Sequence, residues 1–378
     1  MIKNVRGWLA RLIQVGALTV AAVSATSASA ATGTLVRANC SPIAAAADGT
    51  MVWHSATAAG WDDVYVGDGN CSGTALLPPH DGHRGPADIT KDGRYVLLVT
   101  AVGWDRRTEG AAPGKGSQNA IQLYDRQAGK LSTLLPGALK TQRGVIWPKF
   151  NADGTKIVWA QMTKTMFEVN FPWGDWELHV ADVNLATGTL SNNRAWHDPS
   201  GNNGQLESYG WIPRTNRIVF LSNQQPVDTT KDMFRSSQLY SLPDTFSYTT
   251  PPTRISPKMA PSWSWQKPVD VFHEFAHFSP NDADTMYTSI GANTVGGDDL
   301  FTYDLRTAGS DGLLGQPKRI SYFGGDMNLN WGTKAIPGWP APRYRVVINM
   351  AWINGAWVAG VCPDMYCTTT EAWRISLP

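Results

Sequence analysis

The chain has 378 residues, 42% of them hydrophobic, and carries 32 Lys and Arg against 31 Asp and Glu. A chain of this length and hydrophobic content can bury a large core, which excludes disorder over most of the sequence. The near balance of charge excludes the basic surface that is typical of proteins that bind nucleic acid or anionic membranes. We therefore expect a folded protein with no nucleic-acid partner.

Residues 1–30 have the pattern of a secretory signal peptide. Three basic residues precede an apolar run over residues 12–25, and the small residues at 28–30 match a cleavage site. The run is shorter than a membrane-spanning helix, and no later segment resembles one. The sequence thus predicts export without a membrane span, with a secreted or periplasmic single domain over residues 31–378.

All four cysteines follow the predicted cleavage site, and an even number in an oxidising compartment predicts two disulfides. Four cysteines allow three pairings. Cys362 and Cys367 are close in sequence, so a local bridge between them is preferred, which leaves Cys40 to pair with Cys71. The alternative, a zinc site, lacks paired C-x-x-C spacing.

A hairpin signal recurs along the predicted domain, as an apolar stretch, a tight turn and a second β-rich stretch. Asp-Gly between such stretches favours a hairpin, because glycine supplies the positive φ that the turn requires. The six predicted turns, in chain order, are Asp48-Gly49, Asp92-Gly93, Asp153-Gly154, Arg214-Thr215-Asn216, Asn281-Asp282 and Asn354-Gly355.

Each hairpin is followed by a third alternating strand, and the first five units add a short fourth strand. The third strands are expected at residues 63–66, 121–125, 177–182, 238–241, 300–304 and 372–375. The fourth strands are expected at residues 74–77, 130–135, 188–191, 252–255 and 317–320.

The sixth unit has no fourth strand of its own, which would leave a sheet edge exposed. Residues 33–37 offer a strand of the missing type near the start of the domain. The sequence therefore predicts an all-β, six-bladed β-propeller with four-stranded blades, in which this N-terminal strand closes the last blade. A multi-sheet β-solenoid is the alternative.

Three segments carry a resemblance to a known family: Ile89-Thr90-Lys91-Asp92-Gly93, Phe150-Asn151-Ala152-Asp153-Gly154 and Phe278-Ser279-Pro280-Asn281. With the apolar strand and the Leu-Tyr-Asp-like strand that follow, they resemble TolB-type, WD40-like propeller repeats. The resemblance covers the whole predicted domain and implies the propeller fold. That family includes periplasmic protein-binding propellers, propeller halves of peptidases and some polysaccharide lyases, so the resemblance does not select a function.

The string His273-Glu274-Phe275-Ala276-His277 matches the H-E-x-x-H pattern of zinc proteases, which works only on a helix. Its flanking residues predict the first strand of the fifth blade instead. On a strand the two imidazoles lie roughly 13 Å apart and cannot ligate one zinc ion. The sequence thus argues against this zinc site and leaves the metal and the cofactor of the protein, if it has either, unidentified.

The first strand of each propeller blade lines the central channel, so polar residues on these strands are expected to converge around its mouth. There they could transfer protons, hold a metal or bind a ligand, or form only a hydrogen-bonded channel lining. The candidate catalytic residues are His273, His277, Arg84, Lys149 and Tyr209. The candidate ligand-binding residues on these strands are His83, Asp88, Trp147, Glu207 and Trp211.

Tryptophan is abundant, and several copies have loop-like, Pro- or Gly-containing surroundings. Tryptophan stacks on sugars and is enriched at binding hot spots. The loop candidates for binding are Trp173, Trp176, Trp263, Trp265 and Trp339. The tryptophans that fall inside predicted strands are expected to pack between blades: Trp53, Trp159, Trp352 and Trp373.

Two carboxylate pairs, Asp62-Asp63 and Asp298-Asp299, precede third strands. They are expected to be solvated turn ends, with calcium binding as the alternative.

The sequence favours a non-catalytic binding module that recognises a protein or an oligosaccharide. The alternative is a polysaccharide lyase with His273 or His277 as base or metal ligand. In that alternative Arg84, Lys149 or Tyr209 would neutralise or protonate a uronate-type substrate.

Overall fold

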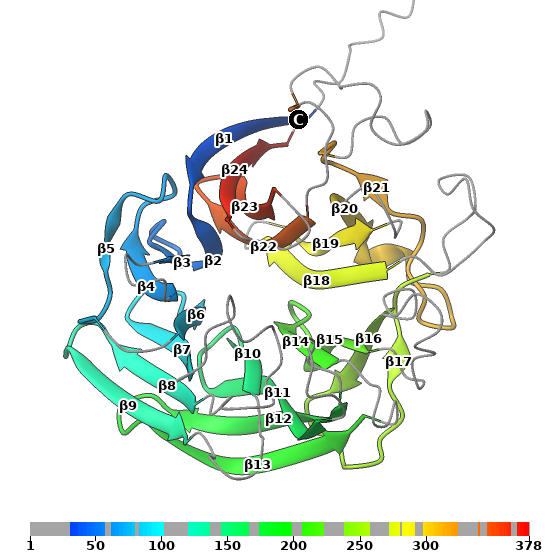
Figure 1. The fold of residues 1–378 in the computed structure, drawn as a ribbon. Coiled ribbons are helices and arrows are strands. Elements are labelled where there is room, and N and C mark those ends of the chain that lie inside the picture. Colours follow the sequence, from blue (N-terminus) through cyan, green and yellow to red (C-terminus); the bar gives the residue numbers. More distant parts are fainter. Residues whose placement is uncertain are drawn as a thin grey trace, which may run out of the picture. The chain divides into compact units, whose positions relative to one another are not determined.

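Six four-stranded antiparallel sheets account for the strands of the structure, a computed structural model (Figure 1). The sheets are the blades of a propeller ring, and residues 31–377 form one unit. The described residues are 31–56, 62–79, 83–101, 120–136, 145–165, 174–198, 206–222, 238–257, 272–279, 282–291, 298–323, 339–340, 346–363 and 369–377.

The first three blades each run from an inner strand to an outer strand in chain order. Blade 1 contains β2 (Ser41–Ala45), β3 (Met51–Ala56), β4 (Asp62–Gly67) and β5 (Gly73–Ala75). Blade 2 contains β6 (His83–Ile89), β7 (Tyr95–Ala101), β8 (Ala120–Asp125) and β9 (Lys130–Leu135). Blade 3 contains β10 (Val145–Phe150), β11 (Lys156–Thr165), β12 (Gly174–Asn184) and β13 (Thr189–His197).

The next two blades repeat this order, and the sixth differs in its outer strand. Blade 4 contains β14 (Leu206–Trp211), β15 (Arg217–Ser222), β16 (Gln238–Pro243) and β17 (Thr253–Arg254). Blade 5 contains β18 (Phe272–Ser279), β19 (Asp282–Gly291), β20 (Asp298–Asp304) and β21 (Lys318–Arg319). Blade 6 contains β22 (Val346–Ile353), β23 (Ala356–Cys362), β24 (Glu371–Ser376) and β1 (Thr32–Ala38).

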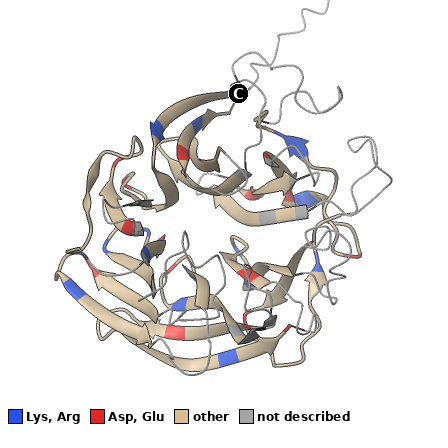
Figure 2. Cartoon of the chain, viewed as in Figure 1, with Lys and Arg blue, Asp and Glu red and all other residues tan. Residues whose placement is uncertain are grey.

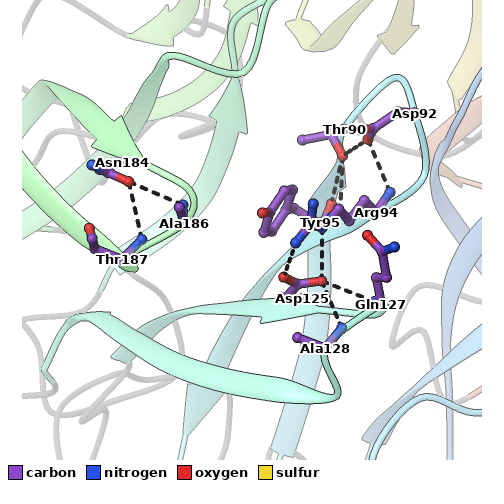
Figure 3. A network of polar contacts seen from close by, with 10 residues as sticks. All are labelled: Thr90, Asp92, Arg94, Tyr95, Asp125, Gln127, Ala128, Asn184, Ala186 and Thr187. Carbon is purple, nitrogen blue, oxygen red and sulfur yellow. Dashed lines mark hydrogen bonds and ion pairs between the residues drawn. The ribbon is translucent and has the colours of Figure 1, made fainter.

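Side chains at the turns fix the hairpins that the sequence predicts. Asp92 accepts hydrogen bonds from the Thr90 hydroxyl at 2.6 Å and the Arg94 backbone N–H at 3.1 Å, while Gly93 adopts a φ of 73° (Figure 3). The Asn184 side chain likewise accepts hydrogen bonds from the backbone N–H groups of Ala186 and Thr187. Asp and Asn favour such turns because their side chains bond nearby backbone donors.

Strand β1 closes the ring, as the sequence predicts. It pairs antiparallel with β24, from Thr32 opposite Ser376 to Ala38 opposite Glu371. The edge of β24 is thereby covered by a strand from the other end of the domain. Basic and acidic residues are scattered around the blades (Figure 2), in keeping with the balanced composition.

The hydrophobic core lies largely between neighbouring blades. Trp159 belongs to a cluster shared by blades 2 and 3, and Trp53 to one shared by blades 1 and 6. Trp373 is buried in the largest cluster, and Trp352 packs against it. The prediction that the strand tryptophans pack between blades is thus confirmed. Trp176 is a correction: it lies in β12, only 1% exposed, in the core between blades 3 and 4 rather than in a loop.

The predicted disulfide between Cys40 and Cys71 is present, with both side chains buried. Cys362 is also disulfide-bonded. Cys367, its preferred partner from the sequence, lies outside the described residues. No helix within the described ranges has the length and apolar character needed to cross a membrane.

Candidate functional site

Every inner strand carries a β-bulge at a corresponding point. A bulge inserts unpaired residues and re-aims the side chains that follow. We call the residues at which pairing resumes the bulge ring, and they are Ala44, Asp88, Lys149, Gly210, His277 and Asn349. The inner strands are those nearest the axis in Figure 1. The bulge ring places a polar residue on the inner strand in four of the six blades.

Asp88 and Lys149 join blade 2 to blade 3. The Lys149 amine donates to the Ala87 carbonyl at 2.6 Å, and the Asp88 carboxylate accepts from the backbone N–H groups of Ile89 and Phe150. Burial lowers the pKa of Lys149, and the Asp88 charge opposes this shift. Burial also raises the pKa of Asp88, which the Lys149 charge and the two backbone donors oppose.

His277 and Asn349 join blade 5 to blade 6. The His277 Nε2 atom lies 2.9 Å from the Asn349 Oδ1 atom, which also accepts from the Met350 N–H. Burial and, to a smaller extent, the Lys149 charge lower the pKa of His277 to about 3, and the bond to Asn349 opposes this shift. At neutral pH the ring is therefore uncharged, and the tautomer that fits this contact carries its proton on Nε2.

Asn349 is a site residue that the sequence analysis missed. The repeat could have revealed it. Lys149 and His277 precede the turn residues Asp153 and Asn281 of their hairpins by four residues, and Asn349 precedes Asn354 by five. An asparagine on an apolar strand has no distinctive pattern when the repeats are not aligned.

A second group of predicted residues lies before or within the bulges. Arg84 forms two hydrogen bonds with Asp63 of blade 1, at 2.8 and 3.0 Å, and both side chains are buried. His273 is buried with its Nε2 atom 2.8 Å from the Tyr303 hydroxyl, and the Tyr209 hydroxyl donates to Glu207 at 2.7 Å.

The predicted candidates therefore lie at different points along the inner strands. Arg84 and Asp88 are four residues apart on β6, a separation of roughly 13 Å along a regular strand. Trp147 lies within its bulge with a φ of 49°, and both it and Trp211 are partly exposed. The His83 side chain is not described, and Trp173, Trp263 and Trp265 lie outside the described residues.

The expectation that the two carboxylate pairs are solvated turn ends is wrong for the described members. Asp63 is 5% exposed and bonded to Arg84. Asp299 is 2% exposed and accepts from the Arg319 guanidinium, the Ser321 hydroxyl and a backbone N–H. Both carboxylates are buried partners of arginine, which leaves their oxygens committed within the protein.

The H-E-x-x-H string lies in β18, as the sequence predicts, and not in a helix. Its two histidines bond to different groups, the Tyr303 hydroxyl within blade 5 and the Asn349 amide of blade 6. Within the described part of the chain, no group of three or more His, Cys, Asp or Glu side chains is placed to hold a metal ion.

We expect acid to destabilise the propeller partly through His277. An unfolded histidine titrates near pH 6.5, whereas the folded group has a pKa of about 3. Between these values only the unfolded chain takes up the proton, so stability falls as the pH drops from about 6.5 towards 3. The expected slope is about 1 kcal/mol per pH unit. Urea unfolding of the wild-type protein and the His277→Gln variant across this range measures it. Equal slopes in both proteins would remove His277 as the cause.

No protein-family model matches the chain, and a search of curated proteins also finds no match. Among solved structures, the chain is similar to a putative TolB from Agrobacterium tumefaciens, at 13% identity and a TM-score of 0.46, over 89% of each chain. An oligogalacturonate lyase in complex with manganese gives 11% identity and a TM-score of 0.46, over 93% of this chain and 94% of the lyase. A prolyl endopeptidase gives 11% identity and a TM-score of 0.45, over 92% of this chain and 41% of that one.

The chain thus spans less than half the length of the prolyl endopeptidase. Likeness at these identities concerns the fold alone and carries no argument about activity. The six four-stranded sheets and the β1 seam define the class, a closed six-bladed propeller. The structure thus confirms the six-bladed propeller fold that the repeats predict.

Proposed function

We propose that the chain is an exported, non-catalytic binding module whose ring centre and neighbouring aromatic residues recognise a protein or a glycan. One observation carries the proposal: each predicted catalytic side chain bonds to another group of the protein. The five contacts are Arg84 with Asp63, Lys149 with the Ala87 carbonyl, Tyr209 with Glu207, His273 with Tyr303 and His277 with Asn349.

The protonation of these groups supports the same proposal. A general base works best with a pKa near the working pH. His277 has a pKa of about 3, and burial raises the pKa of Tyr303, the partner of His273, well above its usual range. Neither His277 nor Tyr303 therefore exchanges a proton readily near pH 7.

Partly exposed aromatic side chains near the bulge ring supply the recognition surface in this proposal. Trp147 and Trp211 stand on the neighbouring inner strands β10 and β14, and the Ser208 hydroxyl holds the Trp147 carbonyl at 2.7 Å. Indole faces bind sugars and partner side chains with little entropy cost, because they have only two rotatable bonds.

Binding and catalysis are separated by one experiment on the mature protein. Arrays of uronic-acid and neutral oligosaccharides, and cross-linking to proteins of its own compartment, test for a ligand. Absorbance of polygalacturonate solutions tests for new unsaturation. We expect a complex that Trp147→Ala weakens at least roughly tenfold, with no unsaturated product. Unsaturated product that His277→Ala abolishes in a folded protein would replace the proposal.

A polysaccharide lyase is the second candidate, and Lys149 is the observation that favours it. Its amine makes one hydrogen bond among the described residues, and burial lowers its pKa. A cation held near the ring axis could neutralise a uronate carboxylate as charge develops beside it. If unsaturated product appears, loss of activity in Lys149→Met with an unchanged unfolding midpoint assigns this role.

A further inference from the structure

An aspartate lies at or near the end of the third strand in three blades. Strand pairing places Asp125 opposite Tyr95 in blade 2, Asp182 opposite Lys156 in blade 3, and Asp304 opposite Thr285 in blade 5. Blade 4 has Pro243 at this position, opposite Arg217. Blade 4 is thus the only one of these four blades that lacks the carboxylate, and it is also the one in which an arginine lies opposite the position.

Two basic groups near the same position in blades 2 and 3 have carboxylate partners. Arg94 binds Asp125 through two hydrogen bonds, at 2.7 and 3.0 Å (Figure 3). Lys156 binds Asp244 of blade 4 at 2.7 Å, which commits the carboxylate next to Pro243 to blade 3. Arg217 is left without the type of partner that its neighbours have.

The hydrogen bonds of Arg217 all go to neutral oxygens. Its Nε and Nη2 atoms donate to the Ser241 hydroxyl at 3.1 and 2.8 Å, and Nη2 also lies 3.2 Å from the Ser241 carbonyl and 3.3 Å from the Thr253 hydroxyl. The Nη1 group finds no acceptor among the described residues. Since the guanidinium stays charged, these contacts fix its position without neutralising it.

Arg217 lines a cavity of about 760 Å³ between blades 4 and 5. This volume lies in the range of small-ligand sites. Apolar walls come from Ile212, Ile255, Leu305 and Leu314, and no aromatic side chain of the described residues lines the cavity. An aliphatic ligand therefore suits the walls better than a sugar ring, which favours aromatic platforms.

The other charged groups of the cavity are already engaged. Arg214 lies 3.4 Å from Asp284, and Arg306 binds Asp304 at 2.7 Å. Asp311 accepts from the Leu313 N–H in its own turn. The two aspartates that line the cavity disfavour a ligand with several negative charges, while Arg217 favours a ligand with a single negative charge.

We propose that the cavity between blades 4 and 5 binds a carboxylate carried on a short apolar body, with the Arg217 guanidinium as its anchor. The carboxylate takes the place of the aspartate that blade 4 lacks, and the aliphatic walls hold the apolar part. This site goes beyond the proposed function, since it lies away from the ring axis and needs none of the bulge ring. A free aliphatic acid and the C-terminus of a peptide share the required chemistry.

Saturation-transfer NMR on the mature protein tests the site with sodium hexanoate and with a tetrapeptide that ends in leucine, as the free acid and as the amide. We expect hexanoate, the free-acid peptide or both to bind, and Arg217→Gln to weaken binding at least roughly tenfold. Binding of hexanoate identifies a free acid as sufficient, and binding of the peptide alone identifies a C-terminus. No binding at roughly 10 mM, equal binding of the amide, or equally tight binding of inorganic phosphate overturns the proposal.

A second variant keeps the test decisive if Arg217→Gln fails to fold. Pro243→Asp restores the carboxylate of the other blades and should abolish hexanoate binding by occupying the guanidinium from within. Pro243→Asn is the matched control, because it has the same shape without the charge, and it should bind as the wild-type protein does. Unchanged binding in Pro243→Asp would contradict the assignment of Arg217 as anchor.

Discussion

Replacing Arg84 by methionine is expected to lower the free energy of unfolding by about 3–5 kcal/mol. The Arg84 and Asp63 side chains are 5% and 7% exposed, so the substitution leaves a carboxylate buried without its counter-charge. It also removes the donor to the Pro78 carbonyl at 2.7 Å. Urea unfolding at neutral pH, followed by tryptophan fluorescence, measures the loss.

The matched control is Arg94→Met in blade 2. Arg94 forms the same two-bond contact with Asp125, but its side chain is 41% exposed. Removing this exposed side chain opens Asp125, itself 14% exposed, to water, and the Gln127 and Ala128 N–H groups still donate to it, so the unfolding midpoint should change less. Adding Asp63→Asn to Arg84→Met should recover much of the lost stability, because the uncompensated charge is removed. Equal effects of Arg84→Met and Arg94→Met would contradict the argument.

This result bears on function as well as stability. Arg84 belongs to the residues predicted to be catalytic, and a large loss of stability would identify it as a link between blades 1 and 2. The same logic extends to Lys149 and His277, which link blades 2 with 3 and 5 with 6. These polar contacts thus join neighbouring blades. They fix the position of one blade against the next more specifically than hydrophobic packing alone would.

The fold could be predicted because its signals are local. Asp92-Gly93 fixes a hairpin through a side-chain acceptor and a positive φ, and both are written in adjacent residues. The seam followed from an exposed edge and a spare strand at residues 33–37, which β1 and β24 now confirm. Repetition then turns six local signals into one architecture.

The candidate site could be predicted only in part because its contacts cross between blades. Asp63 and Arg84 are 21 residues apart, and His277 and Asn349 are 72 apart. The bulge adds one residue to each inner strand, which changes the face on which later side chains emerge. Trp176 shows the same effect, since its Pro- and Gly-rich flank suggested a loop while β12 carries it into the core.

Trp339→Ala is expected to cost about 3–5 kcal/mol and to open the seam of the ring. The Trp339 indole donates from Nε1 to the Ala31 carbonyl at 3.0 Å and packs against Phe323 at a ring distance of 5.0 Å. A Cβ atom at Gly33 would lie 2.6 Å from the indole, so β1 lies directly against this ring. The indole therefore covers β1 at the point where the strand joins blade 6.

Hydrogen exchange distinguishes seam opening from general destabilisation. In Trp339→Ala the amides of β1 should exchange faster than those of inner strand β2. The reason is that β1 is an outer strand, and without the indole only its pairing with β24 holds it in place. The control is Trp196→Ala in blade 3, whose buried indole also donates to a backbone carbonyl, that of Thr250, at 2.7 Å. It should lower the overall stability by a similar amount and leave β1 and β2 protected to the same relative extent. If β1 exchanges no faster than β2 in Trp339→Ala, the strand is held by its pairing with β24 alone, and the indole only fills space.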